Sequence, residues 1–263
     1  DFSSDENKNT VESADKVSIE LDRSSTQSIL KDVPKTYNTQ INDILLSALS
    51  IAYSSWCDES KVLISLEGHG REDLFDSIDV SRTVGWFTSM FPVVLEIYNK
   101  NDIGDSIKLV KETLRQIPNN GIGFGLLKYL NTDENIKEKL KTLPKPEIVF
   151  NYLGQLNENI IPNSDWKLGK KSIILSQSKQ GLRTHLIEIN GIVADNKLKM
   201  DFNFSKNIHK KETIETFAKH YEDALKNIIE HCSDAETGGY TPSDFEAAGL
   251  NQQELDNLLA NLN

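Results

Sequence analysis

Cysteine is scarce in this chain of 263 residues, which contains only Cys57 and Cys232. The two are isolated and form no Cys-x-x-Cys pair, so the sequence predicts neither a disulfide framework nor a zinc site. No apolar run approaches the ~20 residues that a membrane-spanning helix needs. Residues 1–15 are polar and acidic and do not have the pattern of a secretion signal. We therefore expect a soluble, cytoplasmic protein without a metal site.

Positive charge is also in deficit, because 29 Lys and Arg stand against 40 Asp and Glu, a formal net charge of −11. A protein that binds a phosphate backbone needs clustered Lys and Arg, which argues against nucleic acid as a partner. The sequence has no His-Glu-x-x-His, Gly-x-Ser-x-Gly or Walker motif. Metalloprotease, serine hydrolase and nucleotidase functions are therefore not indicated.

Hydrophobic periodicity predicts a mixed α/β fold. Val17, Ile19 and Leu21 alternate with polar residues, as do residues 198–204, which indicates two half-buried strands. Further strands are expected at 61–66, 93–98, 147–152, 172–176 and 185–193, and helices after an N-cap at Thr39 and at 106–117, 124–130 and 210–230. A hairpin turn is expected at residues 194–196, so the pattern favours an α/β sandwich over a doubly wound sheet.

Composition divides the chain into three parts. Residues 1–15, rich in Ser, Asn, Asp and Glu, predict a flexible segment with nothing to bury. Residues 16–232 carry the periodic pattern and predict the folded domain. Residues 233–263 begin as a linker, and a capping-box pattern at Asn251 and Glu254 then predicts a short helix that docks on this domain or a neighbour.

The segment from Leu66 to Pro92 is the most informative part of the chain. A short apolar strand at 61–66 carries Glu67 into a turn with two glycines, Gly68 and Gly70. A carboxylate held in such a turn suits proton transfer. The general alternative is a solvated turn glutamate, because charged side chains are mostly exposed.

Four motifs follow one another in order, at residues 67–72, 82–88, 118–125 and 150–154. They read Glu-Gly-His-Gly-Arg-Glu, Arg-Thr-Val-Gly-Trp-Phe-Thr, Pro-Asn-Asn-Gly-Ile-Gly-Phe-Gly and Phe-Asn-Tyr-Leu-Gly. Together they resemble the epimerization domain of nonribosomal peptide synthetases, within the condensation-domain superfamily. The resemblance covers only the second half of such a domain. It implies the C-terminal lobe of a chloramphenicol acetyltransferase-like α/β sandwich.

The resemblance also implies an activity, the L-to-D inversion of Cα in an aminoacyl or peptidyl thioester. The substrate would be carried on the phosphopantetheine arm of a peptidyl carrier protein, with no cofactor bound directly. Inversion needs proton transfer on both faces of Cα, and Glu67 is the candidate catalytic acid or base on this side. The family's other catalytic group is a histidine of a His-His-x-x-x-Asp motif in the N-terminal lobe. No adjacent histidine pair occurs here, so we expect this lobe to need that N-terminal lobe as a partner.

Two residues of these motifs are candidate supporting groups with open roles. Arg82 could stabilise an enolate oxygen or hold Glu67 ionised, and we do not choose between them at this point. Either Asn151 or Tyr152 is expected to face the substrate, because neighbours on a strand point to opposite faces.

His69 and Trp86 complete the set of candidate site residues. We interpret His69 as a hydrogen-bonding residue of the turn rather than as the base, since its role depends on its partners. Trp86 and Phe87 are expected mainly in the core, where with Phe91 they would partly desolvate Glu67 and raise its pKa.

Two other functions stay open from the sequence. A condensation domain shares the fold that the resemblance implies but forms a peptide bond, although the motifs at 67–72 and 82–88 favour epimerization. A lobe without activity would instead dock a carrier protein or a partner synthetase. The tail after Tyr240 would then matter most, because the similar stretch in the resembling synthetases leads to the next module or partner chain.

Overall fold

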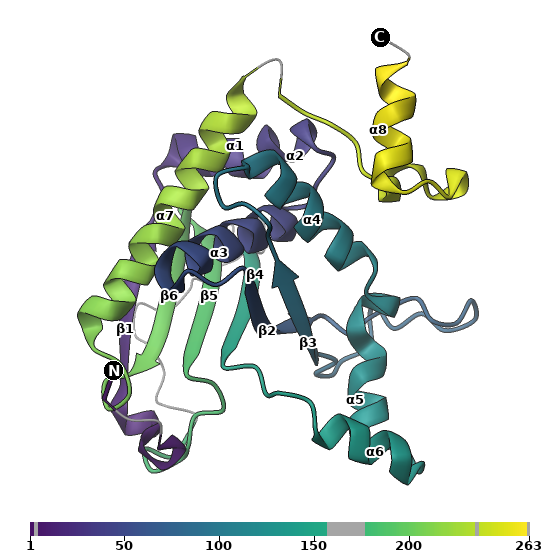
Figure 1. Ribbon diagram of the computed structural model, residues 1–263. Helices are drawn as coiled ribbons and strands as arrows, with labels where there is room; N and C mark the ends of the chain where they lie inside the picture. Colours follow the sequence, from purple (N-terminus) through teal and green to yellow (C-terminus); the bar gives the residue numbers. More distant parts are fainter. Residues whose placement is uncertain (3–4, 157–176, 235–236, 262–263) are drawn as a thin grey trace, which may run out of the picture.

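The computed structural model describes residues 1–2, 5–156, 177–234 and 237–261. Within them, six strands form one sheet in the order β1-β6-β5-β4-β2-β3 (Figure 1). The strands are β1 Ala14–Glu20, β2 Lys61–Gly68, β3 Ser89–Glu96, β4 Ile148–Leu156, β5 Ile187–Ala194 and β6 Lys197–Ser205. Strand β4 pairs in parallel with β2 and β5, and the other pairs are antiparallel. The predicted mixed α/β fold is confirmed.

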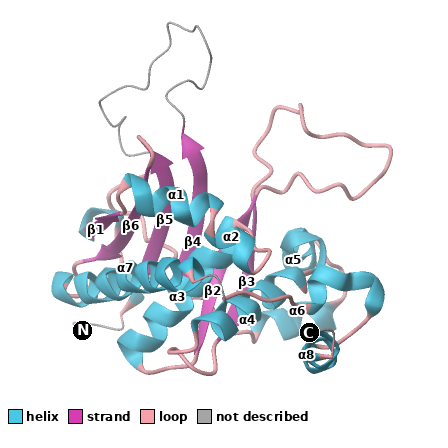
Figure 2. Cartoon of the chain, turned by 90° about the horizontal axis from the view of Figure 1, so that it is seen from above, coloured by secondary structure: helices cyan, strands magenta, loops and turns pink. Residues whose placement is uncertain are grey.

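Helices α3 and α7 lie together on one side of the sheet, as Figures 1 and 2 show. The described helices are α1 Arg23–Lys31, α2 Val33–Thr36, α3 Ile41–Cys57, α4 Ile103–Arg115, α5 Ile122–Tyr129, α6 Glu134–Lys141, α7 Lys211–Ser233 and α8 Gln252–Ala260. Short 3-10 turns occur at η1 Glu6–Lys8, η2 Val11–Ser13, η3 Pro118–Gly121 and η4 Pro242–Ala248. Among these helices, none combines the length and the apolar character needed to cross a membrane.

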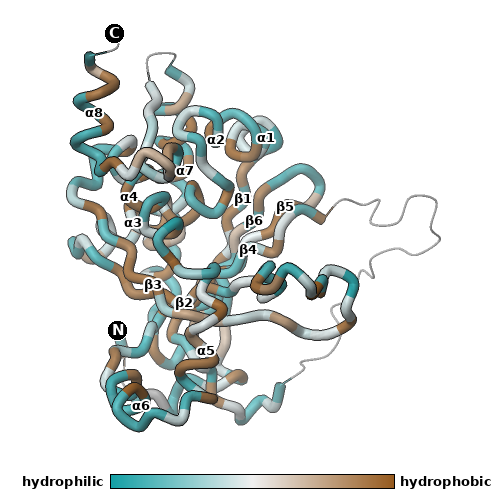
Figure 3. Tube along the Cα trace, turned by 90° about the vertical axis from the view of Figure 1, so that its right-hand side faces the viewer, coloured by the Kyte–Doolittle hydropathy of each residue, from teal (hydrophilic) through white to brown (hydrophobic). Residues whose placement is uncertain are grey.

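The core lies between the sheet and the two long helices. On β6, Phe202 and Phe204 are fully buried, and the ring centroid of Phe202 is 5.6 Å from those of Phe217 and Tyr221 on α7. Burial of each such side chain contributes about 1.5–3 kcal/mol. Figure 3 shows many hydrophobic residues around β2 and β3, at the other edge of the sheet. The alternation predicted for residues 198–204 is thus confirmed, with one face of β6 in the core.

The opposite face of the sheet, which we call the open face, is mainly polar. Strand register places its residues in rows that cross the sheet. One row contains Lys16, Asn203, Glu188, Val149 and Ser65, and the next contains Ser18, Asp201, Asn190 and Asn151. Glu67 extends the second row, because it follows Leu66, which pairs with Phe150 next to Asn151. This arrangement brings the motifs at 67–72 and 150–154 together.

The N-terminal segment differs from the sequence-based expectation. Asn9 is only 3% exposed, and its amide donates a hydrogen bond of 2.9 Å to the carbonyl of His185. Strand β1 begins at Ala14, before the boundary at residue 16. The prediction that residues 1–15 bury nothing is therefore wrong, because a polar side chain can be buried when backbone carbonyls satisfy it. The division of the chain into three parts stays a prediction.

Several predicted element boundaries also need correction. Helix α3 is capped by Gln40 rather than Thr39, and the Gln40 N–H donates to the Asp43 carboxylate at 2.7 Å. Helices α1, α2 and α6 were not predicted; α1 buries only Thr26 and Ile29, which is too weak an apolar stripe to detect. The strand predicted at 172–176 lies outside the described residues. The hairpin is confirmed, with positive φ at Asp195 and at the residue after it.

Candidate active site

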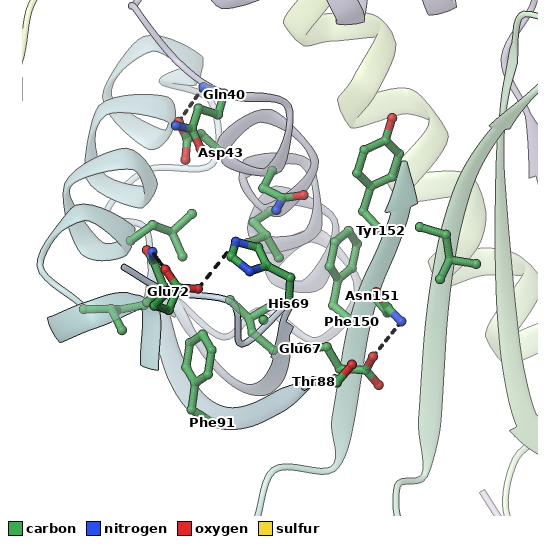
Figure 4. A pocket seen from close by; sticks show the side chains of 18 of the residues that line it. Gln40, Asp43, Glu67, His69, Glu72, Thr88, Phe91, Phe150, Asn151 and Tyr152 are labelled. Atoms are coloured by element: carbon green, nitrogen blue, oxygen red, sulfur yellow. Dashed lines mark hydrogen bonds and ion pairs between the residues drawn. The ribbon is translucent and has the colours of Figure 1, made fainter. Parts of the chain in front are cut away.

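A cavity of about 620 Å³ lies where β2 and β4 end, beside the start of α3 and the end of α4. Figure 4 shows side chains from these elements turned toward a common space. The lining includes residues from all four motifs, among them Glu67, Trp86, Asn120 and Asn151. His69 and Tyr152 line it as well. The strands that carry these residues are far apart in the sequence, and the parallel pairing of β2 with β4 brings their ends together.

Glu67 is the half-buried carboxylate of this cavity. Its Oε2 atom accepts a hydrogen bond of 2.7 Å from the Asn151 side-chain amide (Figure 4). Burial, and then the like charge of Glu188, raise the pKa of Glu67. The partly desolvated carboxyl predicted from the sequence is thus confirmed. A carboxyl with a raised pKa holds its proton to a higher pH than an exposed carboxyl does, which suits it to exchange a proton with a bound group.

The turn after Glu67 depends on glycine at position 70. Gly70 has φ of +67°, and a Cβ atom there would lie 1.7 Å from the carbonyl oxygen of Phe87. The backbone of Phe87, in the loop that leads to β3, therefore lies in direct contact with the backbone of Gly70. Only glycine permits both the conformation and the approach.

His69 and Glu72 connect this turn to η3. The Nδ1 atom of His69 accepts a hydrogen bond of 2.9 Å from the Arg71 backbone, and its Nε2 lies 3.4 Å from Glu72. Glu72 in turn accepts a hydrogen bond of 2.6 Å from Asn120. Because His69 is exposed and engaged with the turn, this geometry fits the interpretation of a hydrogen-bonding residue; its functional role stays a prediction.

Arg71 holds the loop that carries the second motif. Its guanidinium donates to the carbonyls of Val80 and Gly85 and lies 4.2 Å from the ring centroid of Phe87. Arg82, by contrast, is exposed and does not line the cavity. The structure thus does not bring Arg82 to Glu67, because the loop between β2 and β3 extends Arg82 away from the strand ends.

Trp86 lines the cavity but is 90% exposed, so its expected place in the core is wrong. Phe87 is half-buried beneath Arg71. Of the three aromatic residues expected to surround Glu67, Phe91 is the buried one, and it also lines the cavity. An aromatic residue in a loop can be buried for its apolar character or exposed because loops lie at the surface. The sequence pattern alone did not show which applies to Trp86 and Phe87.

Asn151 and Tyr152 point in different directions, as predicted for neighbours on a strand (Figure 4). Asn151 faces Glu67. Tyr152 points away from it, and its buried hydroxyl makes no hydrogen bond within the part of the chain that the structure describes. Burial raises the pKa of Tyr152. Both residues line the cavity, but the Tyr152 hydroxyl itself is buried.

The sequence analysis missed two polar pairs near the cavity. Asp43, 1% exposed, accepts two hydrogen bonds from the guanidinium of Arg115, at 2.7 and 3.1 Å, and both residues line the far wall. Ser65 and His185 form a second pair on the open face. Asp43 lies three residues after the cap Gln40, so the sequence could have shown it as part of a capping box; the pairing of Ser65 with His185 had no local signal.

Among the described residues, no cluster of three His, Cys, Asp or Glu could hold a metal.

A mixed sheet is backed by two helices, and a half-buried carboxyl lies at the ends of two parallel strands. These features define the protein as a two-layer α/β domain with a candidate acid–base site. The family model described as Condensation domain matches residues 3–251. The chain therefore belongs to the condensation-domain family, in the form found in nonribosomal peptide synthetases.

Curated relatives are much longer than this chain. Gramicidin S synthase 1 from Brevibacillus brevis is 41% identical, across 92% of this chain but 23% of its own length. Bacitracin synthase 3 from Bacillus licheniformis is 39% identical, across 94% of this chain and 4% of its own length. The chain thus corresponds to a small part of each relative.

Solved structures show the same fold. The epimerization domain from the third module of tyrocidine synthetase B is 35% identical with a TM-score of 0.80, covering 88% of this chain and 51% of that one. The condensation domain from the Monacolin K polyketide synthase has a TM-score of 0.61 at 12% identity, covering 84% of this chain and 48% of that one, and supports the fold alone. The expected chloramphenicol acetyltransferase-like sandwich is confirmed, and this chain spans about half of each matched domain structure.

Proposed function

We propose that this chain is the C-terminal half of an epimerization domain. It inverts Cα, from L to D, in an aminoacyl or peptidyl thioester carried on the phosphopantetheine arm of a carrier protein. The four motifs and the 35% identity to a solved epimerization domain support this assignment over other members of the family. Condensation-type domains act beside carrier-protein domains in multidomain synthetases, which is consistent with such a substrate.

The observation that carries the proposal is the position of Glu67 together with its raised pKa. Its carboxyl lies in a cavity open to a bound group, is held by Asn151, and has a pKa raised by burial. Removal of a proton from Cα beside a thioester carbonyl needs a group that can exchange a proton near neutral pH. A positioned acid or base of this kind contributes roughly 10²- to 10⁴-fold to the rate.

The second proton-transferring group comes from outside this chain. Inversion requires groups on both faces of Cα, and Glu67 serves one face. The histidine motif that the resemblance implies for the other face has no counterpart in this sequence. The chain therefore acts together with the N-terminal half of such a domain, and it is inactive without it.

The remaining motif residues support Glu67 in different ways. Asn151 orients the carboxyl, and Tyr152 supports the wall of the cavity with its hydroxyl buried. His69 keeps the turn in place through Glu72. Trp86 lies exposed at the cavity, where it contacts the incoming carrier arm. Arg82 is too far out on its loop for contact with Glu67, so we assign it to contacts with the other half or the carrier protein.

The test is deuterium exchange at Cα of a carrier-bound aminoacyl thioester in D₂O. We expect no exchange with this chain alone and clear exchange after addition of a half that bears the His-His-x-x-x-Asp motif. Glu67→Gln in the assembled pair should lose the L-to-D conversion while the fold, followed by circular dichroism, persists. Full activity of that variant contradicts the role of Glu67.

A condensation function is the second candidate, because the matching family model is described as a Condensation domain. The same assembled pair separates the two reactions when an acceptor aminoacyl carrier is added. A new amide product without change of configuration at Cα supports peptide-bond formation. A D-configured thioester without amide product supports epimerization. Carrier binding without either product supports a docking role.

A further inference from the structure

A buried serine–histidine pair lies on the open face of the sheet. The Oγ atom of Ser65 and the Nε2 atom of His185 are 3.0 Å apart in a hydrogen bond. Ser65 is 5% exposed and His185 is 8% exposed. A buried hydroxyl and imidazole in contact exchange protons readily, since each can donate and accept. The catalytic role given to Glu67 does not by itself require this pair.

The pair lies beside Glu67. Ser65 and Glu67 are two residues apart on β2, so their side chains are on the same face and their Cα atoms are about 7 Å apart. Ser65 borders a cavity of about 860 Å³, and Glu67 borders the cavity of about 620 Å³. Thr88 and Phe91 line both cavities, so the two spaces adjoin and leave room for water between the two side chains. One water molecule is enough to connect the hydroxyl with the carboxylate.

The other side of His185 leads to solvent. Its Nδ1 atom is 3.0 Å from the hydroxyl of Thr184, and Thr184 is exposed. Burial lowers the pKa of His185, and Arg183 lowers it further while Glu188 acts in the opposite direction. These are the charged groups that face the imidazole, and they favour its neutral form on balance. A neutral imidazole can accept a proton at one nitrogen and release one from the other.

Epimerization creates a need for such a path. When Glu67 donates a proton to one face of Cα and the opposite group removes one from the other face, Glu67 ends the turnover as a carboxylate. The site is then ready for the reverse reaction and not for a second L-configured substrate. Glu67 must regain a proton before each new turnover, and substrate or product in the cavity blocks its direct exchange with solvent.

We propose that Thr184, His185 and Ser65 form the path by which Glu67 is reprotonated between turnovers, which rests on the function proposed above. A proton enters at Nδ1 of His185 from the side of Thr184, and the Nε2 proton passes to Ser65. The hydroxyl proton of Ser65 passes through water to the Glu67 carboxylate. One proton enters and one leaves at every group, so no other reactant is consumed. The transfer leaves the His185 proton on Nδ1 instead of Nε2, and exchange with solvent returns it to Nε2 before the next turnover. Neither Ser65 nor His185 touches the substrate; both act through Glu67.

The test compares first and later turnovers in the complete domain, formed by this chain and the histidine-bearing half. His185→Gln keeps a hydrogen-bonding side chain but cannot relay a proton. We expect its first turnover, measured with enzyme in excess over substrate, to match the unaltered domain. With substrate in excess, its rate should fall by about tenfold or more, because resetting becomes limiting. Added imidazole buffer should restore that rate.

Ser65→Ala and Ser65→Thr form a matched pair of variants. The path predicts that Ser65→Ala behaves like His185→Gln and that Ser65→Thr, which keeps the hydroxyl, turns over normally. A structural role would instead slow the first turnover as well, with no rescue by imidazole. That result, or an unchanged rate in both His185→Gln and Ser65→Ala, overturns the path. If His185→Gln does not fold, the serine pair alone decides.

The outcomes also separate this inference from the proposed function. If the unaltered complete domain shows no exchange at Cα, the epimerization proposal itself fails. If the unaltered domain is active, Glu67→Gln is inactive with and without imidazole, and His185→Gln is normal throughout, only the proton path fails.

Discussion

The protonation of Glu67 is set by its immediate surroundings, and this has a measurable consequence for stability. Burial, then Glu188, raise its pKa above the ordinary 4.5. The folded chain therefore binds this proton more tightly than the unfolded chain, and stability falls as pH rises through the two pKa values. We expect Glu67→Gln to be more stable than the unaltered chain at about pH 7, by less than about 1 kcal/mol, and equal to it at about pH 3. Thermal unfolding at both pH values checks this; a loss of stability at neutral pH contradicts it.

Asn151 acts in the opposite direction from burial, because its amide hydrogen bond favours the charged carboxylate. Asn151→Ala should therefore raise the pKa of Glu67 further. The measurement is an NMR titration of the side-chain carboxyl carbon in selectively labelled protein. Asn190→Ala is the matched control, since Asn190 lies beside Asn151 in the same row of the sheet. An equal shift in both variants would mean that general desolvation, and not the hydrogen bond, sets the proton affinity.

At the level of single residues, Glu67 and Asn151 lie in the cavity as the sequence predicted. Trp86 was expected in the core but is exposed, and Arg82 was expected near Glu67 but does not line the cavity. The first two lie at the ends of strands with clear patterns, and strand geometry determines where such side chains point. The other two lie in the connection between β2 and β3, which contains no helix or strand among residues 69–88. Their positions depend on the Arg71 contacts with backbone carbonyls, which no local pattern encodes.

Among the elements, the turn between β2 and its following loop is the most constrained. Gly70→Ala should destabilise the chain by more than about 1 kcal/mol, because alanine disfavours positive φ and its Cβ would overlap the Phe87 carbonyl. Gly123→Ala is the matched control. Gly123 lies inside α5 with no heavy atom within 4 Å of the added Cβ, so alanine should stabilise by up to about 1 kcal/mol. Urea midpoints of the two variants should move in opposite directions; equal midpoints would contradict the close approach at Gly70.

Elements with a regular apolar pattern were predicted within a few residues, and those without one were not. Helix α7 buries one continuous stripe, and its predicted range 210–230 differs little from the observed Lys211–Ser233. Helix α6, with no buried residue, gave no such signal. Helix α5 was predicted at 124–130 and is observed at Ile122–Tyr129, so Gly123 is helical as well.

At the scale of the whole molecule, the sheet order was beyond the reach of the sequence. The pattern indicated strands and one hairpin, but parallel pairing of β4 with both β2 and β5 joins segments that are distant in the chain. Ser65 and His185 meet across that pairing although 120 positions separate them. A proton path built on such a contact can be recognised only once the strands are placed.

The C-terminal segment is joined to the rest of the molecule by a buried ion pair. The Lys111 ammonium on α4 lies 2.7 Å from both carboxylate oxygens of Asp244, and the two side chains are 1% and 5% exposed. Lys111 also donates to the Tyr37 carbonyl at 2.9 Å. Burial alone would raise the pKa of Asp244, but hydrogen bonds from Lys111, Thr241 and Asn38 lower it on balance. The linker predicted after residue 233 is thus tied to α4 at Asp244.

Asp244→Ala should destabilise the chain by about 3–5 kcal/mol, because it leaves the Lys111 ammonium buried without its carboxylate. The added change Lys111→Met should recover much of this loss, since an apolar side chain then occupies the site. Glu96→Ala, which breaks an exposed pair with Lys61, is the control and should cost less than about 1 kcal/mol.

Because the folded pKa of Asp244 is lowered, the stability that Asp244 contributes is present above the ordinary pKa value of 3.8 and is lost as pH falls. Urea unfolding measures the energies, and limited proteolysis after Tyr240 should be faster in Asp244→Ala alone; equal proteolysis in all three variants would mean that the segment is held elsewhere.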